Sequence, residues 1–490
     1  MHAVHSSGFT RRASILVLAT FSLAFCAGLL TGCGSQMAGP PPPVGNTQVV
    51  VLFTSTANDQ LTLFNAFVTS ITLNNQAGGV TTLFSSPQPI GLGVEWMHLN
   101  GALEPIVTLA VPQGTYTSAQ VTVADCSFTT VTFTNSTLLT STDAEGTCGQ
   151  GSGTTTVNLA APITITGSVM GLSFDLQVAQ SFTESGPGAN QTYTISPVFT
   201  LTPVSISSQP TNETNGRITG LDAQVSALNA TSNNFMLLTT DGVTLTVKSD
   251  ASTVYQGLAG LSSLATNELV NFDVAIQSDG SLLATRVEVE DATVPLAAVG
   301  TYVSPGFVSG QLITLSQERN GCQAPGAPFC GELFQDTNTT QFGTSGQFSN
   351  VTSLPFPATF DSSTMVPGEN ISIFYPGTFD AQSFQNVTTI TLAPQTLNGM
   401  VTAVSNQNGF AVYTVSLASY NLFPTLQMFN TLGPRITDPT TLVVYVDTST
   451  QMLNSGMIQV GSLLRFRGLV FNDNGALRMD AGQIYDGVPE

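Results

Sequence analysis

The stretch Asp250-Ala251-Ser252-Thr253-Val254-Tyr255 recurs late in the chain as Asp447-Thr448-Ser449-Thr450-Gln451-Met452. A hairpin signal precedes each copy, Asp241-Gly242 in the first case and Asn408-Gly409 in the second, because Asx-Gly pairs favour two-residue β-turns. An apolar run and a second Asx-Gly turn follow each copy. This shared order, over roughly 80 to 95 residues, indicates an internal repeat.

Three segments in the C-terminal half follow this order. We call them repeat A (residues 216–292), repeat B (299–394) and repeat C (397–490), and repeat B matches the pattern least closely. Alternating apolar residues between turn signals predict about five or six short strands in each, forming a small closed or partly open barrel. Phe272 of repeat A and Phe466 of repeat C are expected to occupy the same buried strand position.

Residues 47–206 also read as β-structure but lack the repeat, so we expect a separate β-sandwich there. A stretch rich in Asn, Thr, Ser and Pro, from Ser207 to Asn215, predicts a linker between this sandwich and repeat A. The predicted strands of the sandwich are Val49 to Thr54, Phe67 to Leu73, Ile106 to Val111, Gln120 to Ala124, Thr154 to Leu159 and Tyr193 to Leu201.

Two resemblances follow from these segments. Pro112-Gln113-Gly114-Thr115-Tyr116, followed by Gln120 to Val123, resembles the turn and strand of prealbumin-like sandwiches, in particular an exported sandwich domain of unknown function that recurs in bacterial lipoproteins. Repeats A to C resemble an exported bacterial domain of unknown function with an OB-like barrel, usually found in tandem. Together the resemblances imply an all-β chain: an N-terminal β-sandwich followed by three small β-barrel-like repeats.

The composition supports an all-β fold and excludes some partners. Hydrophobic residues make up 42% of the chain and charged residues only 8%, with abundant Thr and β-branched residues, which suits strands better than helical bundles. The formal net charge is −20. Such a field repels nucleic acid and anionic lipid headgroups, so we expect no nucleic-acid partner.

The N-terminus has the organisation of a secretory signal. Arg11 and Arg12 precede an uncharged run that ends in Leu30-Thr31-Gly32-Cys33, which resembles a bacterial lipobox. The resemblance implies a signal peptide over residues 1–32, acylation of Cys33, a tether over residues 33–46 and anchoring in the bacterial outer membrane. An ordinary signal peptide or a retained membrane helix are the alternatives.

Four cysteines remain after Cys33, and they fall into two local pairs. In an exported chain we expect disulfides between Cys126 and Cys148 and between Cys322 and Cys330, although three connectivities are formally possible. Neither pair has the Cys-x-x-Cys spacing of a zinc site, and a single histidine, His98, follows Cys33. We therefore expect neither a metal site nor a cofactor.

Sequence patterns for catalysis are weak. Glu95-Trp96-Met97-His98 has the Glu-x-x-His spacing of a di-metal element, but in one copy only, so a structural role is favoured for His98. A core position is favoured for Trp96, and stacking on a sugar ring is the alternative. Asn472-Asp473-Asn474-Gly475 fits a hairpin turn better than a calcium loop. The chain has no Gly-x-Ser-x-Gly nucleophile motif, and no catalytic residue is predicted.

Together these patterns predict a non-catalytic envelope lipoprotein that displays β-domains as a structural or adhesive module. The alternative is a lipoprotein that binds polysaccharide or another small ligand, with polysaccharide or envelope proteins as partners. A hydrolase is the least favoured interpretation, since it would need two carboxylates converging in a cleft.

Overall fold

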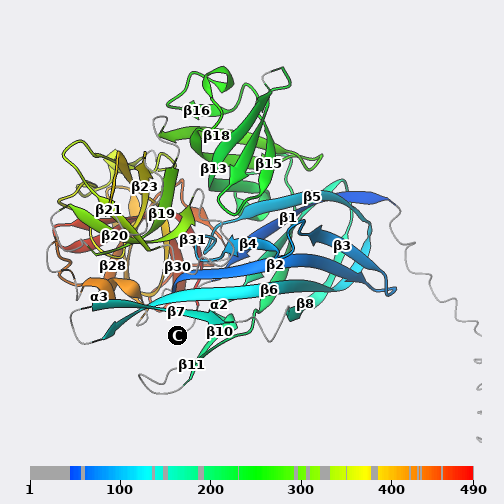
Figure 1. Ribbon diagram of the computed structural model, residues 1–490, viewed down its shortest axis with the longest axis horizontal. Helices are drawn as coiled ribbons and strands as arrows, with labels where there is room; N and C mark the ends of the chain where they lie inside the picture. The colour runs from blue at the N-terminus through cyan, green and yellow to red at the C-terminus, as the bar shows by residue number, and fades with distance from the viewer. Residues whose placement is uncertain are drawn as a thin grey trace, which may run out of the picture. The chain divides into compact units, whose positions relative to one another are not determined.

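The computed structural model describes residues 45–488, except for short gaps at 57–60, 135–137, 147–152, 186–191, 230, 292–295, 305–309, 320–330, 349, 377–383, 419–420, 428–429, 431–432 and 454–455. Within this part the chain is nearly all β, which confirms the predicted fold class (Figure 1). Among the described residues, no helix is long and apolar enough to cross a membrane.

Two principal sheets form the N-terminal sandwich. One sheet has the order β12-β9-β1-β5; the other has the order β3-β2-β6-β7, with β4 paired to β2 and β8 paired to β6. A short helix, α2 (Val178–Ser181), and the hairpin β10–β11 complete it. The strands are β1 (Asn46–Ser55), β2 (Leu61–Asn75), β3 (Val80–Ser85), β4 (Leu92–Glu95), β5 (Glu104–Pro112), β6 (Gly114–Thr134), β7 (Leu138–Gly146), β8 (Gly153–Ile165), β9 (Val169–Leu176), β10 (Phe182–Ser185), β11 (Thr192–Ile195) and β12 (Phe199–Val204).

Strand β1 shows how the sequence determines this arrangement. Its apolar run from Val49 to Phe53 is fully buried, so side chains on both faces of the strand are covered. Both edges of β1 are also paired, with β5 antiparallel and with β9 parallel. A strand buried on both faces is expected to be continuously apolar. At the predicted Gly-Thr-Tyr turn, the buried Tyr116 donates a hydrogen bond from its hydroxyl to the carbonyl of Pro112.

Repeats A and C share one strand topology. In repeat A the strand order is β15-β14-β13-β17-β18, and a parallel pairing between β15 and β18 closes the sheet. In repeat C the order is β28-β27-β26-β30-β31, and β28 and β31 pair in the same way. The helix α3 (Leu422–Gln427) is inserted in repeat C. The strands are β13 (Arg217–Asn229), β14 (Asn234–Thr239), β15 (Thr244–Lys248), β16 (Val254–Gln256), β17 (Leu269–Ile276) and β18 (Leu282–Asp291) in A, and β26 (Gln395–Gln407), β27 (Phe410–Leu417), β28 (Thr441–Val446), β29 (Gln451–Met452), β30 (Leu463–Asp473) and β31 (Ala476–Asp486) in C.

Repeat B has the same order, with its last strand broken in two. β24 pairs in parallel with β21, and β25 pairs with β23, so that the segment from β24 to β25 closes the sheet. The strands are β19 (Leu296–Ser304), β20 (Gln311–Arg319), β21 (Gly331–Gln335), β22 (Gln341–Thr344), β23 (Asn370–Tyr375), β24 (Gln385–Asn386) and β25 (Thr389–Leu392).

A recurring pair of hydrogen bonds fixes the turn before the short fourth strand of each repeat. In repeat A the backbone N–H of Asp250 donates to the Thr253 hydroxyl, which in turn donates to the carbonyl of Ala284 in the final strand. The same two bonds join Thr337, Thr340 and Val387 in repeat B, and Asp447, Thr450 and Ala481 in repeat C. The sequence motif that indicated the repeat therefore attaches this turn to the last strand segment of the barrel.

Phe272 and Phe466 occupy equivalent positions, as predicted. Both are fully buried, and each is paired with a leucine of the first strand and a β-branched residue of the last strand. The pairs are Phe272 with Leu221 and Val287, and Phe466 with Leu397 and Ile484.

The stretch Ser207 to Asn215 is not the free linker that its composition suggests. It contains a 3-10 helix, Glu213–Asn215, capped by the side chain of Asn212, and Glu213 is buried. The Glu213 carboxylate accepts a hydrogen bond from the side-chain amide of Gln483 and lies 3.2 Å from the hydroxyl of Tyr485, both in β31. The stretch does connect β12 to β13, and its composition gave no sign of these buried contacts because polar residues in a connection can also find partners in a neighbouring module.

Candidate functional site

The most unusual group of side chains lies in the turn between β4 and β5. Glu95 ends β4, and its carboxylate accepts backbone N–H groups from Phe64, Met97 and His98. Three such bonds satisfy a buried carboxylate and fold the following turn around it. The turn therefore presents His98 in a fixed orientation.

Trp96 anchors the same turn in the sandwich core. Its side chain is fully buried, with ring centroids 5.0 Å from Phe53 and 5.6 Å from Phe199. The hydroxyl of Ser55 donates to the Trp96 carbonyl at 2.5 Å. The predicted core position of Trp96 is confirmed, and a buried indole cannot stack on a sugar ring.

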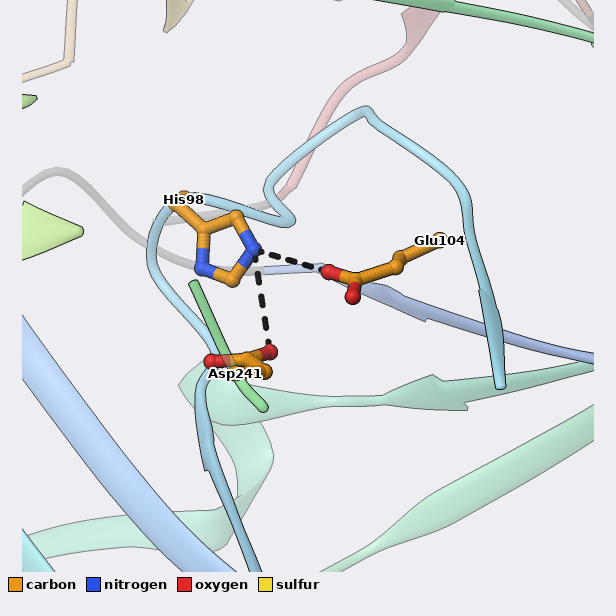
Figure 2. Close-up of side chains that lie close together, drawn as sticks. All are labelled: His98, Glu104 and Asp241. Atoms are coloured by element: carbon orange, nitrogen blue, oxygen red, sulfur yellow. Dashed lines mark hydrogen bonds and ion pairs between the residues drawn. The ribbon is translucent and has the colours of Figure 1, made fainter. Parts of the chain in front are cut away.

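The imidazole of His98 faces two further carboxylates. Its Nε2 atom lies 3.4 Å from Oε2 of Glu104, the first residue of β5, and 3.9 Å from Oδ2 of Asp241 (Figure 2). Its Nδ1 atom lies 3.5 Å from Oε2 of Glu95. The side chains of His98, Glu104 and Asp241 are 9%, 3% and 6% exposed, so the group, which we call the His98 cluster, is buried.

Asp241 reaches this cluster from repeat A. It lies at the tip of the β14–β15 hairpin, where Gly242 adopts the left-handed conformation with φ of 82°. Its Oδ1 atom accepts the backbone N–H of Glu95 at 3.2 Å. The predicted Asp241-Gly242 turn is thus correct, and the tip of that turn binds to the sandwich.

The charge balance of the cluster is unusual. Between Cys33 and Gly216 the sequence contains no Lys or Arg, so His98 is the one side chain of the sandwich sequence that can carry a positive charge near neutral pH. Within the described part of the chain, the ion pair of Glu104 is with His98, and its Oε1 atom is buried without a hydrogen-bond partner. One imidazole and two carboxylates can hold a divalent metal or share a proton.

A polar cavity of about 90 Å³ adjoins His98. The sandwich and all three repeats contribute to its lining, mainly through amide, hydroxyl and charged side chains. Among them are Asn100, Asp222, Asn271, Asn370, Gln395 and Arg467. Beside the cavity, Asn100 joins sandwich and repeat C: its carbonyl accepts from Thr396 at 2.5 Å and its side chain accepts from Arg465 at 3.1 Å.

The other predicted site residues are only partly described. Leu30, Thr31, Gly32 and Cys33 lie outside the described residues, as do Cys148, Cys322 and Cys330. Cys126 is buried in β6, where it is paired with Gly146 of β7, two positions before Cys148. Both disulfides and the acylation of Cys33 therefore remain predictions. The Asn474-Gly475 turn between β30 and β31 is confirmed, with φ of 52° and 91°.

The Glu-x-x-His spacing drew attention to Glu95 and His98, for which a structural role was favoured, but gave no sign of Glu104 or Asp241. Glu104 gave no signal beyond its charge, and Asp241 was interpreted only as a turn residue. No sequence spacing links Asp241 to His98, because the contact arises from the docking of one module on another.

No protein-family model matches this chain, and the search of curated proteins finds no match either. The function is therefore inferred from the residues and their geometry.

Proposed function

We propose that this chain is a lipid-anchored protein of the bacterial outer membrane, periplasmic or surface-facing, whose β-modules form a non-catalytic structural or adhesive unit. The N-terminal sequence supports the anchor, because a basic pair, an apolar run and Leu30-Thr31-Gly32-Cys33 follow the order of a lipoprotein signal. Several acyl chains hold a protein on a membrane far more firmly than one.

The observation that carries the display function is the buried polar contact between modules. Tyr485 of repeat C donates to the carbonyl of Gly101 in the sandwich at 2.6 Å, and lies 3.2 Å from the Glu213 carboxylate of the connecting segment. Asn100 adds the two bonds from repeat C described above. The modules therefore belong to one compact unit, residues 44–490, within which each repeat keeps its own sheet. A compact array of β-modules suits a stiff display element.

The alternative, binding of polysaccharide or another small ligand, is less well supported. The cavity measures about 90 Å³, which is room for a small group of water molecules. Small-molecule pockets usually measure about 300–1,000 Å³. A polysaccharide partner would therefore bind on an outer face of the modules rather than in this cavity.

A hydrolase is also less well supported. Glu104 and Asp241 do converge, as a glycosidase would require, but their side chains are only 3% and 6% exposed and both face an imidazole. A sugar chain cannot enter between two carboxylates buried in this way.

Metabolic labelling with a fatty-acid analogue tests the anchor. The full chain should take up the label and fractionate with membranes, whereas Cys33→Ser should do neither. Cys26→Ser is the matched control, because Cys26 lies within the apolar run and not at the expected cleavage site; it should be labelled as the parent chain is. An unlabelled parent chain released to the medium would contradict the proposal.

Glycan-array binding by the full chain separates the two remaining functions. A display module should bind no glycan above background, whereas a polysaccharide-binding protein should bind a related group of glycans in a saturable way. Saturable binding would favour the alternative over the display function.

A further inference from the structure

We propose that the His98 cluster is a binding site for one divalent transition-metal ion, of which Zn²⁺ is the representative, held by Nε2 of His98 and by the carboxylates of Glu104 and Asp241. This inference goes beyond the display function and does not depend on the lipid anchor. It also revises the expectation from the sequence that the chain has no metal site.

The distances within the cluster suit such an ion. Bonds from zinc to imidazole nitrogen and carboxylate oxygen measure about 2.0–2.2 Å, so tetrahedral ligand atoms lie about 3.3–3.5 Å apart. Nε2 of His98 is 3.4 Å from Oε2 of Glu104 and 3.9 Å from Oδ2 of Asp241, and all three ligand atoms lie within 4.8 Å of one another. Small side-chain movements would complete the geometry.

The orientation of the imidazole is that of a metal ligand. Figure 2 shows the Nε2 atom directed at both carboxylates, Glu104 on one side and Asp241 on the other. The opposite nitrogen, Nδ1, faces Oε2 of Glu95 at 3.5 Å. Metal-binding histidines commonly direct their second ring nitrogen at a carboxylate, which fixes the tautomer. Glu95 is itself fixed by its three backbone N–H donors.

Glu104 provides a second, independent indication of a ligand. It is 2% exposed, and its Oε1 atom has no hydrogen-bond partner among the residues that the structure describes. A buried carboxylate oxygen without a partner loses its hydration and gains nothing in return. A cation between Glu104 and Asp241 that is bound by both carboxylate oxygens of Glu104 would supply the missing partner of Oε1 and the missing positive charge.

The ligand types select the class of metal. Imidazole together with carboxylates suits Zn²⁺ and neighbouring transition metals, whereas Ca²⁺ prefers six to eight oxygen ligands. Three protein ligands leave a fourth position for water, and the polar cavity adjoins His98. The ion would link the turn after β4 to the β14–β15 hairpin, and so attach repeat A to the sandwich.

Zinc titration of the full chain tests the proposal. The protein is purified without a histidine tag, stripped with a chelator and titrated with Zn²⁺ against a chromogenic competitor. The parent chain should bind one ion, and Glu104→Gln and Asp241→Asn should each weaken binding more than about 100-fold, since even indirect changes at such sites cost 10–100-fold. Ca²⁺ should not compete.

Asp175→Asn is the matched control. Asp175 is a carboxylate of β9 in the same sandwich, is bonded to Thr56 and Gln177, and lies outside the cluster. This variant should bind Zn²⁺ as the parent chain does. Equal binding by the parent chain, Glu104→Gln and Asp241→Asn would show that zinc binds elsewhere and would overturn the proposal, as would no binding by the parent chain.

Co²⁺ provides a measurement that does not depend on whether the variants fold. Bound to the parent chain, Co²⁺ should give the visible absorption of a four-coordinate site with nitrogen and oxygen ligands. Intense near-ultraviolet absorption from cobalt–thiolate bonds would place the ion at cysteines instead, and the spectrum of hydrated Co²⁺ would mean no site. Either result would refute the assignment.

Discussion

Replacing Glu213 by Gln should change how the stability of the protein depends on pH. Burial raises the pKa of Glu213 from 4.5 to about 7, an effect that the hydrogen bonds from Gln483 and Tyr485 and the nearby charge of Arg467 offset only in part. The folded protein therefore keeps a proton on Glu213 at pH values where the unfolded chain has lost it. The stability that this proton contributes is fully present below about pH 4.5 and is lost as the pH rises towards about 7.

The magnitude follows from the shift. One pKa unit corresponds to about 1.4 kcal/mol, so a rise from 4.5 to about 7 should remove about 3 kcal/mol of unfolding free energy across this range. The glutamine that replaces Glu213 cannot ionise, and its amide retains an oxygen acceptor for Gln483. The variant should therefore match the parent chain at about pH 4.5 and exceed its stability by about 3 kcal/mol at about pH 8.

Denaturant unfolding of both proteins between about pH 4.5 and about pH 8 measures this difference. Asp279→Asn is the control, because hydrogen bonds from Ser281 and the ion pair with Lys248 lower the pKa of this exposed carboxyl. Its ionisation lies below the tested range, so its difference from the parent chain should stay constant. If the stability difference between Glu213→Gln and the parent chain stayed constant, or fell as the pH rises, Glu213 would not be a buried acid with a raised pKa.

Two further predictions concern the modules. Phe466→Ala should destabilise repeat C by about 3–5 kcal/mol while repeat A keeps its calorimetric transition. The reason is that the hydrophobic core around Phe466 consists of residues of repeat C and Val366, with none from repeat A. Loss of one transition shared by both repeats would instead show a single cooperative unit. Non-reducing peptide mapping should find Cys126 joined to Cys148 and Cys322 joined to Cys330, and crossed pairs would contradict the expected disulfides.

Local features of the fold could be predicted from the sequence because their causes are local. Val49 to Thr54 became β1 since a continuous apolar run suits a strand buried on both faces. Asn474-Gly475 became a hairpin turn since both residues tolerate positive φ. Tyr193 to Leu201 was predicted as one strand but is interrupted between β11 and β12, near Pro197, which has no backbone N–H to donate.

The contacts between modules could not be predicted, because they depend on how finished modules dock. Glu213 lies in a polar stretch whose composition is that of a linker, and only the position of Gln483 and Tyr485 makes it a buried residue. The hairpin tip with Asp241 likewise satisfies every local rule for a turn. Its second role, beside His98, appears only when repeat A meets the sandwich.

The parallel pairing that closes each repeat has a consequence for how the chain is made. β18, the segment from β24 to β25, and β31 make these closing pairings, so that β15, β21 and β28 are paired on both edges. A repeat whose last strand has not yet crossed the membrane exposes two edges, to which a strand of a similar neighbouring repeat can pair. In the exported chain proposed above, the N-terminal end crosses first, so the strands of one repeat are complete before the next repeat arrives. Order of appearance thus protects three similar sequences from exchanging strands.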